Sequence, residues 1–160
     1  MRCDRITLVS IKLLALTVSL AFLTNCSNNP GMKPLLQPVM SADAPAPIGP
    51  YSQAVRTNGL LFCSGQIALD PTTGEMRNGS IEEETLQVMK NMRAVLSEAG
   101  LSFANVAKTT IFLVDMNDFT IVNRIYGEQL GSARPARSTI QVSALPKGAR
   151  VEIECIAVTG

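Results

Sequence analysis

The chain has 160 residues, of which 46% are hydrophobic and 17% are charged, so we expect one compact domain with a short extension. The formal net charge is +1 and no basic run occurs, which argues against nucleic-acid binding, as do only two Tyr, five Phe and no Trp. Histidine is absent, so the commonest general base and metal ligand are excluded, and without a CxxC motif no metal site is expected.

Residues 1–25 have the order of a secretory signal peptide. Arg2, Arg5 and Lys12 form a charged segment, and the eleven residues LLALTVSLAFL that follow form an apolar one. A transmembrane helix needs about 20 apolar residues, so a permanent membrane anchor is the weaker interpretation. The next residues, LTNC, resemble a bacterial lipobox, in which the cysteine, here Cys26, becomes lipidated. Asn25 departs from that pattern, which has Gly, Ala or Ser before the cysteine.

We therefore expect the protein in the cell envelope, in the periplasm or tethered to a membrane through lipidated Cys26. Secretion without lipidation is one alternative, and a cytoplasmic protein is another if translation begins at Met32 or Met40. Residues 26–43 are rich in Pro, Asn, Ser and Ala, a composition that predicts a flexible tether. The folded domain is then residues 44–160.

The first elements of the domain are a hairpin and a helix. Asn58-Gly59 between two short apolar runs is the strongest two-residue signal for a β-hairpin. Ser80, followed three residues later by Glu83, matches the capping box of a helix that ends at Gly100. The apolar positions of this helix recur at helical spacing and predict core packing: Leu86, Met89, Met92 and Leu96.

A second helix and three further strands complete the predicted order β-β-α-β-α-β-β. VAKTTIFLV, residues 106–114, is rich in β-branched residues and predicts a long strand. Residues 117–131 predict a helix that buries Phe119, Val122 and Ile125. Residues 137–158 predict two strands joined by a Pro-Lys-Gly turn. This order indicates a mixed sheet with two helices on one face, an α+β or α/β sandwich.

Three polar or reactive residue types in these strands have a simple structural interpretation. Cys63 and Cys155 lie in apolar strands, which favours buried small hydrophobes over a disulfide or a nucleophile. Arg137 shares one strand face with Thr139, and by itself is more often a partner in a surface ion pair. Glu152 by itself is more often a solvated strand residue.

Four blocks in order change that interpretation: APAPIGPYSQAV, SGQIALDPTTGE, VNRIYGEQLGSARPARST and LPKGARVEIECIAV. From Ala44 to Thr159 the chain resembles the Rid family, the reactive intermediate deaminases also called YjgF proteins. The resemblance implies a chorismate-mutase-like α+β fold and a homotrimer with ligand clefts between subunits. It also implies hydrolysis of small 2-imino acids to 2-keto acids and ammonia, without a cofactor.

The resemblance also implies the site residues. Arg137 pairs with the substrate carboxylate, for which a planar, permanently charged guanidinium is well suited. Glu152 and Tyr51 are the other expected catalytic residues, which position water or move a proton. The expected substrate-binding positions are Ser64, Gly65, Asn123 and Thr139. Many members have Cys where this chain has Thr139, so thiol chemistry is excluded there.

The sequence is compatible with two classes of function. The first is the imine deaminase, and the second is a non-catalytic Rid-like module that binds small carboxylates or protein partners at the same cleft. The label endoribonuclease is also used for relatives, but the near-neutral charge argues against it.

The last expectation concerns assembly. If residues 145–148 are the turn of a final hairpin, Gln141 lies opposite Glu152, and Arg137 is four residues further along. At about 3.3 Å per residue the offset is roughly 13 Å, too long for one small imino acid. We therefore expect Arg137 and Glu152 of one pocket to come from different subunits, unless a bulge changes the register.

Overall fold

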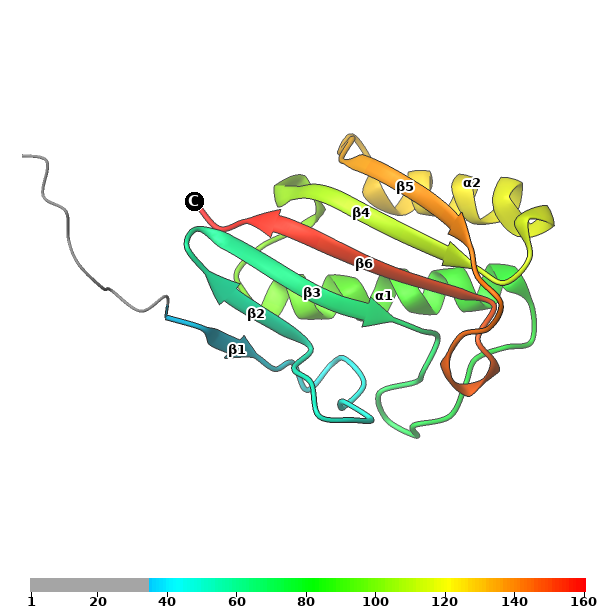
Figure 1. The fold of residues 1–160 in the computed structure, drawn as a ribbon, viewed down its shortest axis with the longest axis horizontal. Helices are drawn as coiled ribbons and strands as arrows, with labels where there is room; N and C mark the ends of the chain where they lie inside the picture. Colours follow the sequence, from blue (N-terminus) through cyan, green and yellow to red (C-terminus); the bar gives the residue numbers. More distant parts are fainter. Residues whose placement is uncertain (1–34) are drawn as a thin grey trace, which may run out of the picture. The chain divides into compact units, whose positions relative to one another are not determined.

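The computed structural model describes residues 35–160, which form a six-stranded mixed sheet with two helices on one face (Figure 1). The order of the strands across the sheet is β1-β2-β3-β6-β4-β5. The strands are β1 (Gln37–Val39), β2 (Ala54–Thr57), β3 (Leu60–Gln66), β4 (Val106–Leu113), β5 (Ala136–Gln141) and β6 (Val151–Val158). The helices are α1 (Ile81–Glu98) and α2 (Phe119–Leu130), with short 3₁₀ turns at Phe103–Asn105, Met116–Asp118 and Pro146–Gly148.

The predicted first hairpin is confirmed. β2 and β3 are antiparallel, with Thr57 opposite Leu60, so Asn58 and Gly59 are the two turn residues. Both have positive φ, 47° and 77° respectively, as a type I′ turn requires. Glycine and asparagine tolerate this conformation, which explains why this dipeptide marks the turn in the sequence.

Helix α1 begins and ends where the sequence predicts. The hydroxyl of Ser80 accepts a hydrogen bond from the backbone N–H of Glu83 at 3.1 Å, and Gly100 follows the helix with a φ of +73°. Met89 and Met92 are buried against the sheet, as predicted. Leu86 is 46% exposed, so its predicted place in the core is wrong, because the buried stripe of α1 passes instead through Thr85 and Val88.

The two helices are crossover connections. α1 links β3 to β4, which lie on either side of β6, and α2 links β4 to β5. β5 is parallel to β4, while β6 is antiparallel to both β3 and β4. Both helices therefore pack on the same face of the sheet, as predicted.

The predicted final hairpin is wrong. β5 and β6 are not neighbours, because β4 lies between them. α2 carries the chain beyond β4, so β5 joins the sheet at its far edge, and the chain then returns to the centre through the 3₁₀ turn at Pro146–Gly148. Gln141 pairs with Leu113 and Glu152 pairs with Phe112, so the predicted pairing of Gln141 with Glu152 does not occur.

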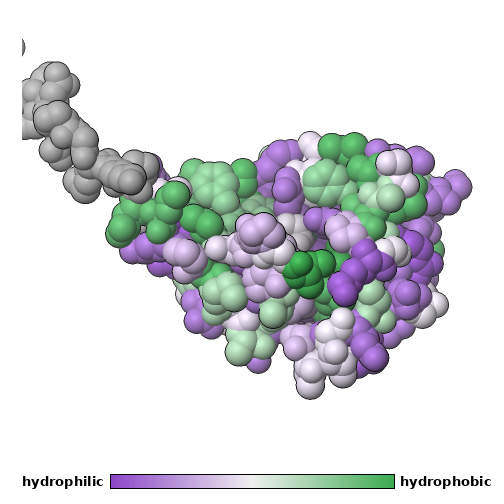
Figure 2. All heavy atoms as spheres, turned by 60° about the horizontal axis from the view of Figure 1, so that its bottom comes forward, coloured by the Kyte–Doolittle hydropathy of each residue, from purple (hydrophilic) through white to green (hydrophobic). Residues whose placement is uncertain are grey.

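Regular structure is present further toward the N-terminus than the sequence predicts. Residues 37–39, inside the predicted flexible tether of residues 26–43, form β1 and pair with β2. Buried Gln53 fixes the next residues: its side chain accepts from the N–H of Ser41 at 2.6 Å and donates to the carbonyl of Pro45 at 2.8 Å. The prediction of a flexible tether is therefore wrong for residues 37–41. Leu35 and Leu36, the first two described residues, are exposed. Figure 2 shows hydrophobic surface where the described part of the chain begins.

The predicted signal peptide, residues 1–25, and the predicted lipidation site Cys26 lie outside the described residues. Within residues 35–160, neither helix has the length and apolarity needed to span a membrane.

Candidate active site

Strand β3 ends in a bulge that opens the sheet next to β6. Cys63 pairs with Cys155 and Gln66 pairs with Ile153, so β3 has one more residue than β6 over this interval. The extra residue lies at Ser64-Gly65, both expected site residues. The hydroxyl of Ser64 donates to the carbonyl of Ser52 at 2.7 Å, which ties the bulge to the loop before β2. Bulges often redirect side chains beside functional sites.

Glu152 of β6 occupies the space that a side chain at Gly65 would fill. A Cβ at Gly65 would lie 1.8 Å from Oε1 of Glu152, so only glycine permits this position of the carboxylate. Burial, and secondarily the charge of Glu154, raise the pKa of Glu152 above its ordinary value. Among the described residues its carboxylate makes no ion pair, so it is available to a ligand or to water.

Tyr51 completes a pocket around this carboxylate. The pocket has a volume of about 240 Å³ and contains four of the expected site residues. It is lined by Ile48, Tyr51, Ser64, Gly65, Ile67, Pro146 and Glu152. The Tyr51 hydroxyl accepts a hydrogen bond from the N–H of Ile48 at 3.3 Å, and its side chain is 46% exposed. We call this group of residues the carboxylate half-site.

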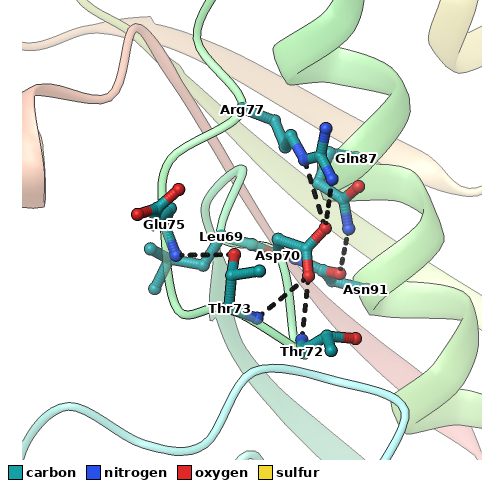
Figure 3. A network of polar contacts seen from close by, with 8 residues as sticks. All are labelled: Leu69, Asp70, Thr72, Thr73, Glu75, Arg77, Gln87 and Asn91. Atoms are coloured by element: carbon teal, nitrogen blue, oxygen red, sulfur yellow. Dashed lines mark hydrogen bonds and ion pairs between the residues drawn. The ribbon is translucent and has the colours of Figure 1, made fainter.

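The loop after β3 forms one wall of the carboxylate half-site and is held by polar contacts (Figure 3). Asp70 accepts hydrogen bonds from the N–H groups of Thr72 and Thr73 and pairs with Arg77 at 2.7 Å. The side chain of buried Asn91 donates to the carbonyls of Ile67 and Leu69. The position of Ile67 in the pocket is therefore fixed by α1.

An ion pair between buried Glu84 and partly exposed Arg150 fixes the segment that leads into β6. Glu84 of α1 is fully buried, and its carboxylate accepts from Nε of Arg150 at 2.7 Å and from the N–H of Arg150 at 2.9 Å. Arg150 immediately precedes β6, so this pair sets where Glu152 enters the sheet.

Arg137 lies in a second group, between β5 and α2. Its guanidinium donates to Oδ1 of Asn123 at 2.7 Å and lies over the rings of Phe119 and Tyr126, 5.8 and 5.3 Å from their centroids. These two rings and the amide fix the guanidinium without neutralising it, since Arg137 makes no ion pair among the described residues. The predicted burial of Phe119 is wrong: it is 36% exposed beside Arg137, whereas Val122 and Ile125 are buried.

Tyr126 also belongs to this group, although it was not among the site residues expected from the sequence. It is buried, and its hydroxyl shares a 2.7 Å hydrogen bond with the hydroxyl of Thr109 on β4. Burial raises its pKa, against the effects of Thr109 and Arg137, so it is a neutral phenol. The sequence did contain a signal for this group. The spacing of four and three residues places Phe119, Asn123 and Tyr126 on one face of the helix.

Thr139 follows Arg137 on the same face of β5. Its hydroxyl is buried and has no hydrogen-bond partner among the described residues. An unpartnered buried hydroxyl is a group that a ligand can satisfy. We call Asn123, Arg137, Thr139 and the two rings of α2 the arginine half-site.

The two half-sites of one chain lie on opposite faces of the sheet. Arg137 pairs with Thr109 and Glu152 pairs with Phe112, both on β4. Paired residues share a face, and residues three apart along a strand point to opposite faces. Arg137 therefore projects toward the helices, and Glu152 toward the open face. Arg137 and Glu152 of one chain are therefore separated, as expected. They are separated because they project from opposite faces of the sheet, and not because they are offset along a hairpin.

A larger depression of about 510 Å³ lies between residues 41–43 and the outer side of α1. Its charged residues have mixed signs, Asp43 and Glu98 against Lys90 and Arg93, and it contains none of the expected site residues. Among residues 35–160 no group of three or more His, Cys, Asp or Glu has the arrangement of a metal site.

The sequence of the folded domain matches known proteins over nearly its whole length. The model of the family described as Endoribonuclease L-PSP matches residues 41–159. The chain belongs to this family. The RutC family protein slr0709 of Synechocystis sp. is 54% identical over 75% of this chain and 94% of that protein. The human protein named 2-iminobutanoate/2-iminopropanoate deaminase is 49% identical over 81% of this chain and 95% of that protein.

The structural comparison agrees with the family assignment. The crystal structure of E. coli TdcF with bound serine matches with a TM-score of 0.72 and 37% identity, over 76% of this chain and 98% of that chain. The predicted membership of the Rid family, also called YjgF, and the predicted chorismate-mutase-like α+β fold are both confirmed. Relatives carry different names, so membership by itself supports deaminase activity without fixing the substrate.

Proposed function

We propose that this Rid-family protein is a deaminase that hydrolyses small 2-imino acids to 2-keto acids and ammonia. The observation that carries the proposal is the placement of the Arg137 guanidinium and the Glu152 carboxylate, which has a raised pKa, on opposite faces of one sheet. Neither group makes an ion pair within residues 35–160. The identity of 49% to the human protein named 2-iminobutanoate/2-iminopropanoate deaminase supports it.

The arginine half-site binds the substrate carboxylate in this proposal. A guanidinium donates two parallel hydrogen bonds to a carboxylate, and Asn123 and the rings of α2 hold Arg137 in one orientation. The free hydroxyl of Thr139 and the backbone near Gly65 face the amino end of the substrate. Serine, the ligand bound to E. coli TdcF in its crystal structure, has the carboxylate and nitrogen of such a substrate.

The carboxylate half-site supplies water and proton transfer. An imine is already electrophilic, so water mainly needs orientation and a proton acceptor. Glu152, assisted by Tyr51, takes a proton as the water oxygen bonds to the imine carbon. This proton passes to the imine nitrogen, which gives a carbinolamine. Glu152 then takes the hydroxyl proton of the carbinolamine and transfers it to the amino nitrogen, and ammonia leaves as the C=O bond forms. Imine and water are consumed and keto acid and ammonia are produced, without an oxidant or cofactor.

The complete site requires a second copy of the chain, and we propose a homotrimer with one site at each subunit interface. The sheet face opposite the helices, on which Glu152 lies, carries exposed Phe62, Ile140 and Val158, and Ile140 lies level with Glu152 because both pair with Phe112 of β4. Apolar residues on an uncovered sheet face favour association with another copy. In this proposal the open face of one subunit docks against the β5–α2 edge of the next, and this brings the carboxylate half-site of the first subunit to the arginine half-site of the second.

A coupled assay tests this function directly. A pyridoxal-phosphate dehydratase generates 2-iminobutanoate from threonine or 2-iminopropanoate from serine, and release of the keto acid is followed with and without the protein. We expect release faster than spontaneous hydrolysis. If the protein binds small carboxylates in calorimetry but does not accelerate keto acid release, the alternative holds, a non-catalytic Rid-like binding module.

A further inference from the structure

Cys63 and Cys155 are direct partners across two antiparallel strands. They occupy the same register position of β3 and β6, and both are buried, with 6% and 2% of their surface exposed. Side chains of directly opposed residues point to the same face, here the face covered by the helices. The two thiols are therefore neighbours in the core.

The backbone geometry at this position suits a disulfide. Directly opposed residues of an antiparallel pair have Cα atoms about 4.5 or 5.5 Å apart, depending on the hydrogen-bonding position. Disulfides join Cα atoms that are about 4.4–6.8 Å apart. A hydrogen bond with Cys63, together with burial, raises the pKa of the Cys155 thiol, which agrees with the two sulfur atoms facing each other.

This cysteine pair lies in a row that joins the two half-sites. Cys155 pairs with Thr109 on β4, and Thr109 pairs with Arg137 on β5. On the other side, Cys63 is followed directly by Ser64 and Gly65 of the bulge. A change in the distance between the two sulfur atoms moves the strand from which the bulge projects.

We propose that Cys63 and Cys155 are a disulfide site, closed by exchange with a small-molecule or protein disulfide, and that closure changes the conformation of the Ser64-Gly65 bulge. The thiolate of Cys63 attacks the donor disulfide and releases one donor thiol. Cys155 then loses its proton and displaces the second donor thiol as the intramolecular S–S bond forms. The two cysteines lose two electrons, and the donor gains them as two thiols.

Burial decides when this exchange occurs. Only the thiolate reacts, and both thiols are shielded in the core, so exchange in the folded protein requires local opening of β3 or β6. Exchange during folding is faster, because the thiols are then exposed. The Cys63–Cys155 disulfide therefore forms when the chain folds in the presence of a disulfide donor. In protein that is already folded and reduced, it forms slowly.

Refolding in glutathione buffers tests the site. The full chain is unfolded with reductant and diluted into glutathione disulfide, and digestion with mass spectrometry follows the peptides of Cys63 and Cys155, which separate from those of Cys3 and Cys26. We expect a Cys63–Cys155 cross-linked peptide, lighter than the two reduced peptides by two hydrogen atoms, and a higher unfolding midpoint. The matched Cys155→Ala variant should carry glutathione on Cys63 or a free thiol.

Recovery of the fold with both thiols free or both joined to glutathione would overturn the disulfide site. If refolding fails, protein that has never been unfolded is incubated for a long time with glutathione disulfide, and the cross-linked peptide is again the deciding result.

The effect of the disulfide on the bulge is measured separately. The amide resonance of Gly65 should shift on oxidation and return with reductant, and an unchanged resonance in the cross-linked protein would refute the coupling. Neither readout depends on the proposed deaminase activity.

Discussion

Arg137 and Glu152 of one chain project from opposite faces of the same sheet. The β4 residues with which they pair, Thr109 and Phe112, are three positions apart. One small substrate cannot contact both side chains of a single chain, because the sheet lies between them. If both residues act on one imino acid, two copies of the chain must contribute to each site.

The contact between Gly65 and Glu152 gives the first prediction. In Gly65→Ala the new Cβ would lie 1.8 Å from Oε1 of Glu152, so the carboxylate must move away. A displacement of about 1 Å at a reacting group costs about 100-fold in rate, and we expect a loss of that order in kcat/KM with the fold retained.

The control for this substitution is Gly127→Ala. Gly127 is exposed in α2, and a Cβ there has no neighbour within 4 Å. Activity should be unchanged, and the helix should gain about 0.5–1 kcal/mol in stability. Near-normal activity in Gly65→Ala would mean that the position of Glu152 does not matter to the reaction.

Replacement of Arg137 by Lys tests the carboxylate anchor. Lysine keeps the charge but loses the planar fork, and a charge-assisted hydrogen bond contributes about 1.5–3 kcal/mol. We expect kcat/KM to fall by about 10- to 100-fold. Arg134→Lys is the matched control, because the hydrogen bonds that exposed Arg134 makes within residues 35–160 go to the carbonyls of Gly131 and Ala133, outside the candidate site. Equal activity of the two variants would contradict the anchor role.

The raised pKa of Glu152 predicts the acid side of the pH profile. A proton acceptor must be ionised, so kcat/KM should fall with acid around a midpoint above 4.5, the ordinary value. Glu154→Gln removes the smaller cause of the shift and should move the midpoint down, though not to 4.5, because burial remains. If the midpoint is the same in Glu154→Gln and in the unmodified protein, Glu152 is not the group that titrates in the pH profile.

The same shift predicts the pH dependence of stability. A carboxyl group whose pKa is raised by folding contributes stability below its unfolded pKa and loses it as pH rises through the folded pKa. Glu152→Gln has no such group. As pH rises through the folded pKa of Glu152, the unmodified protein should lose stability that the Glu152→Gln variant does not lose. The free energy of unfolding of the variant minus that of the unmodified protein should therefore increase with pH, as measured by denaturant unfolding at several pH values.

Processing at the N-terminus is a separate prediction. We propose that the signal peptide of residues 1–25 is removed and that Cys26 is lipidated. Intact-mass and N-terminal peptide analysis of protein from its native host should then find a lipid-modified Cys26. A chain that begins at Met32 or Met40 would support the cytoplasmic alternative, and an unmodified start elsewhere would support secretion without lipidation.

Local signals in the sequence predicted most of the fold. Asn58-Gly59, the Ser80 cap and Gly100 act within a few residues, so the first hairpin and α1 were predictable. The prediction of a final hairpin was wrong because the neighbours of a strand in a sheet depend on residues far away in the sequence. Pro-Lys-Gly between two strands is typical of a turn, yet the crossover through α2 places β5 beyond β4.

The candidate site was predictable from family blocks, but its division into two half-sites was not. The side on which Arg137 projects depends on its pairing with Thr109, which needs the order of the sheet. Tyr126 was missed because a buried aromatic residue in a helix is usually read as core. It is indeed buried, but its ring also lies under the guanidinium.

A mixed-subunit experiment tests the shared site most directly. Arg137→Ala and Glu152→Ala proteins, each of which we expect to be inactive alone, are unfolded and reassembled together, and the mixed oligomers are verified by native mass spectrometry. Some interfaces then join an intact Arg137 to an intact Glu152, so we predict that a fraction of the imine hydrolysis rate returns. No recovery in verified mixed oligomers of two folded parents would contradict a site built from two copies of the chain.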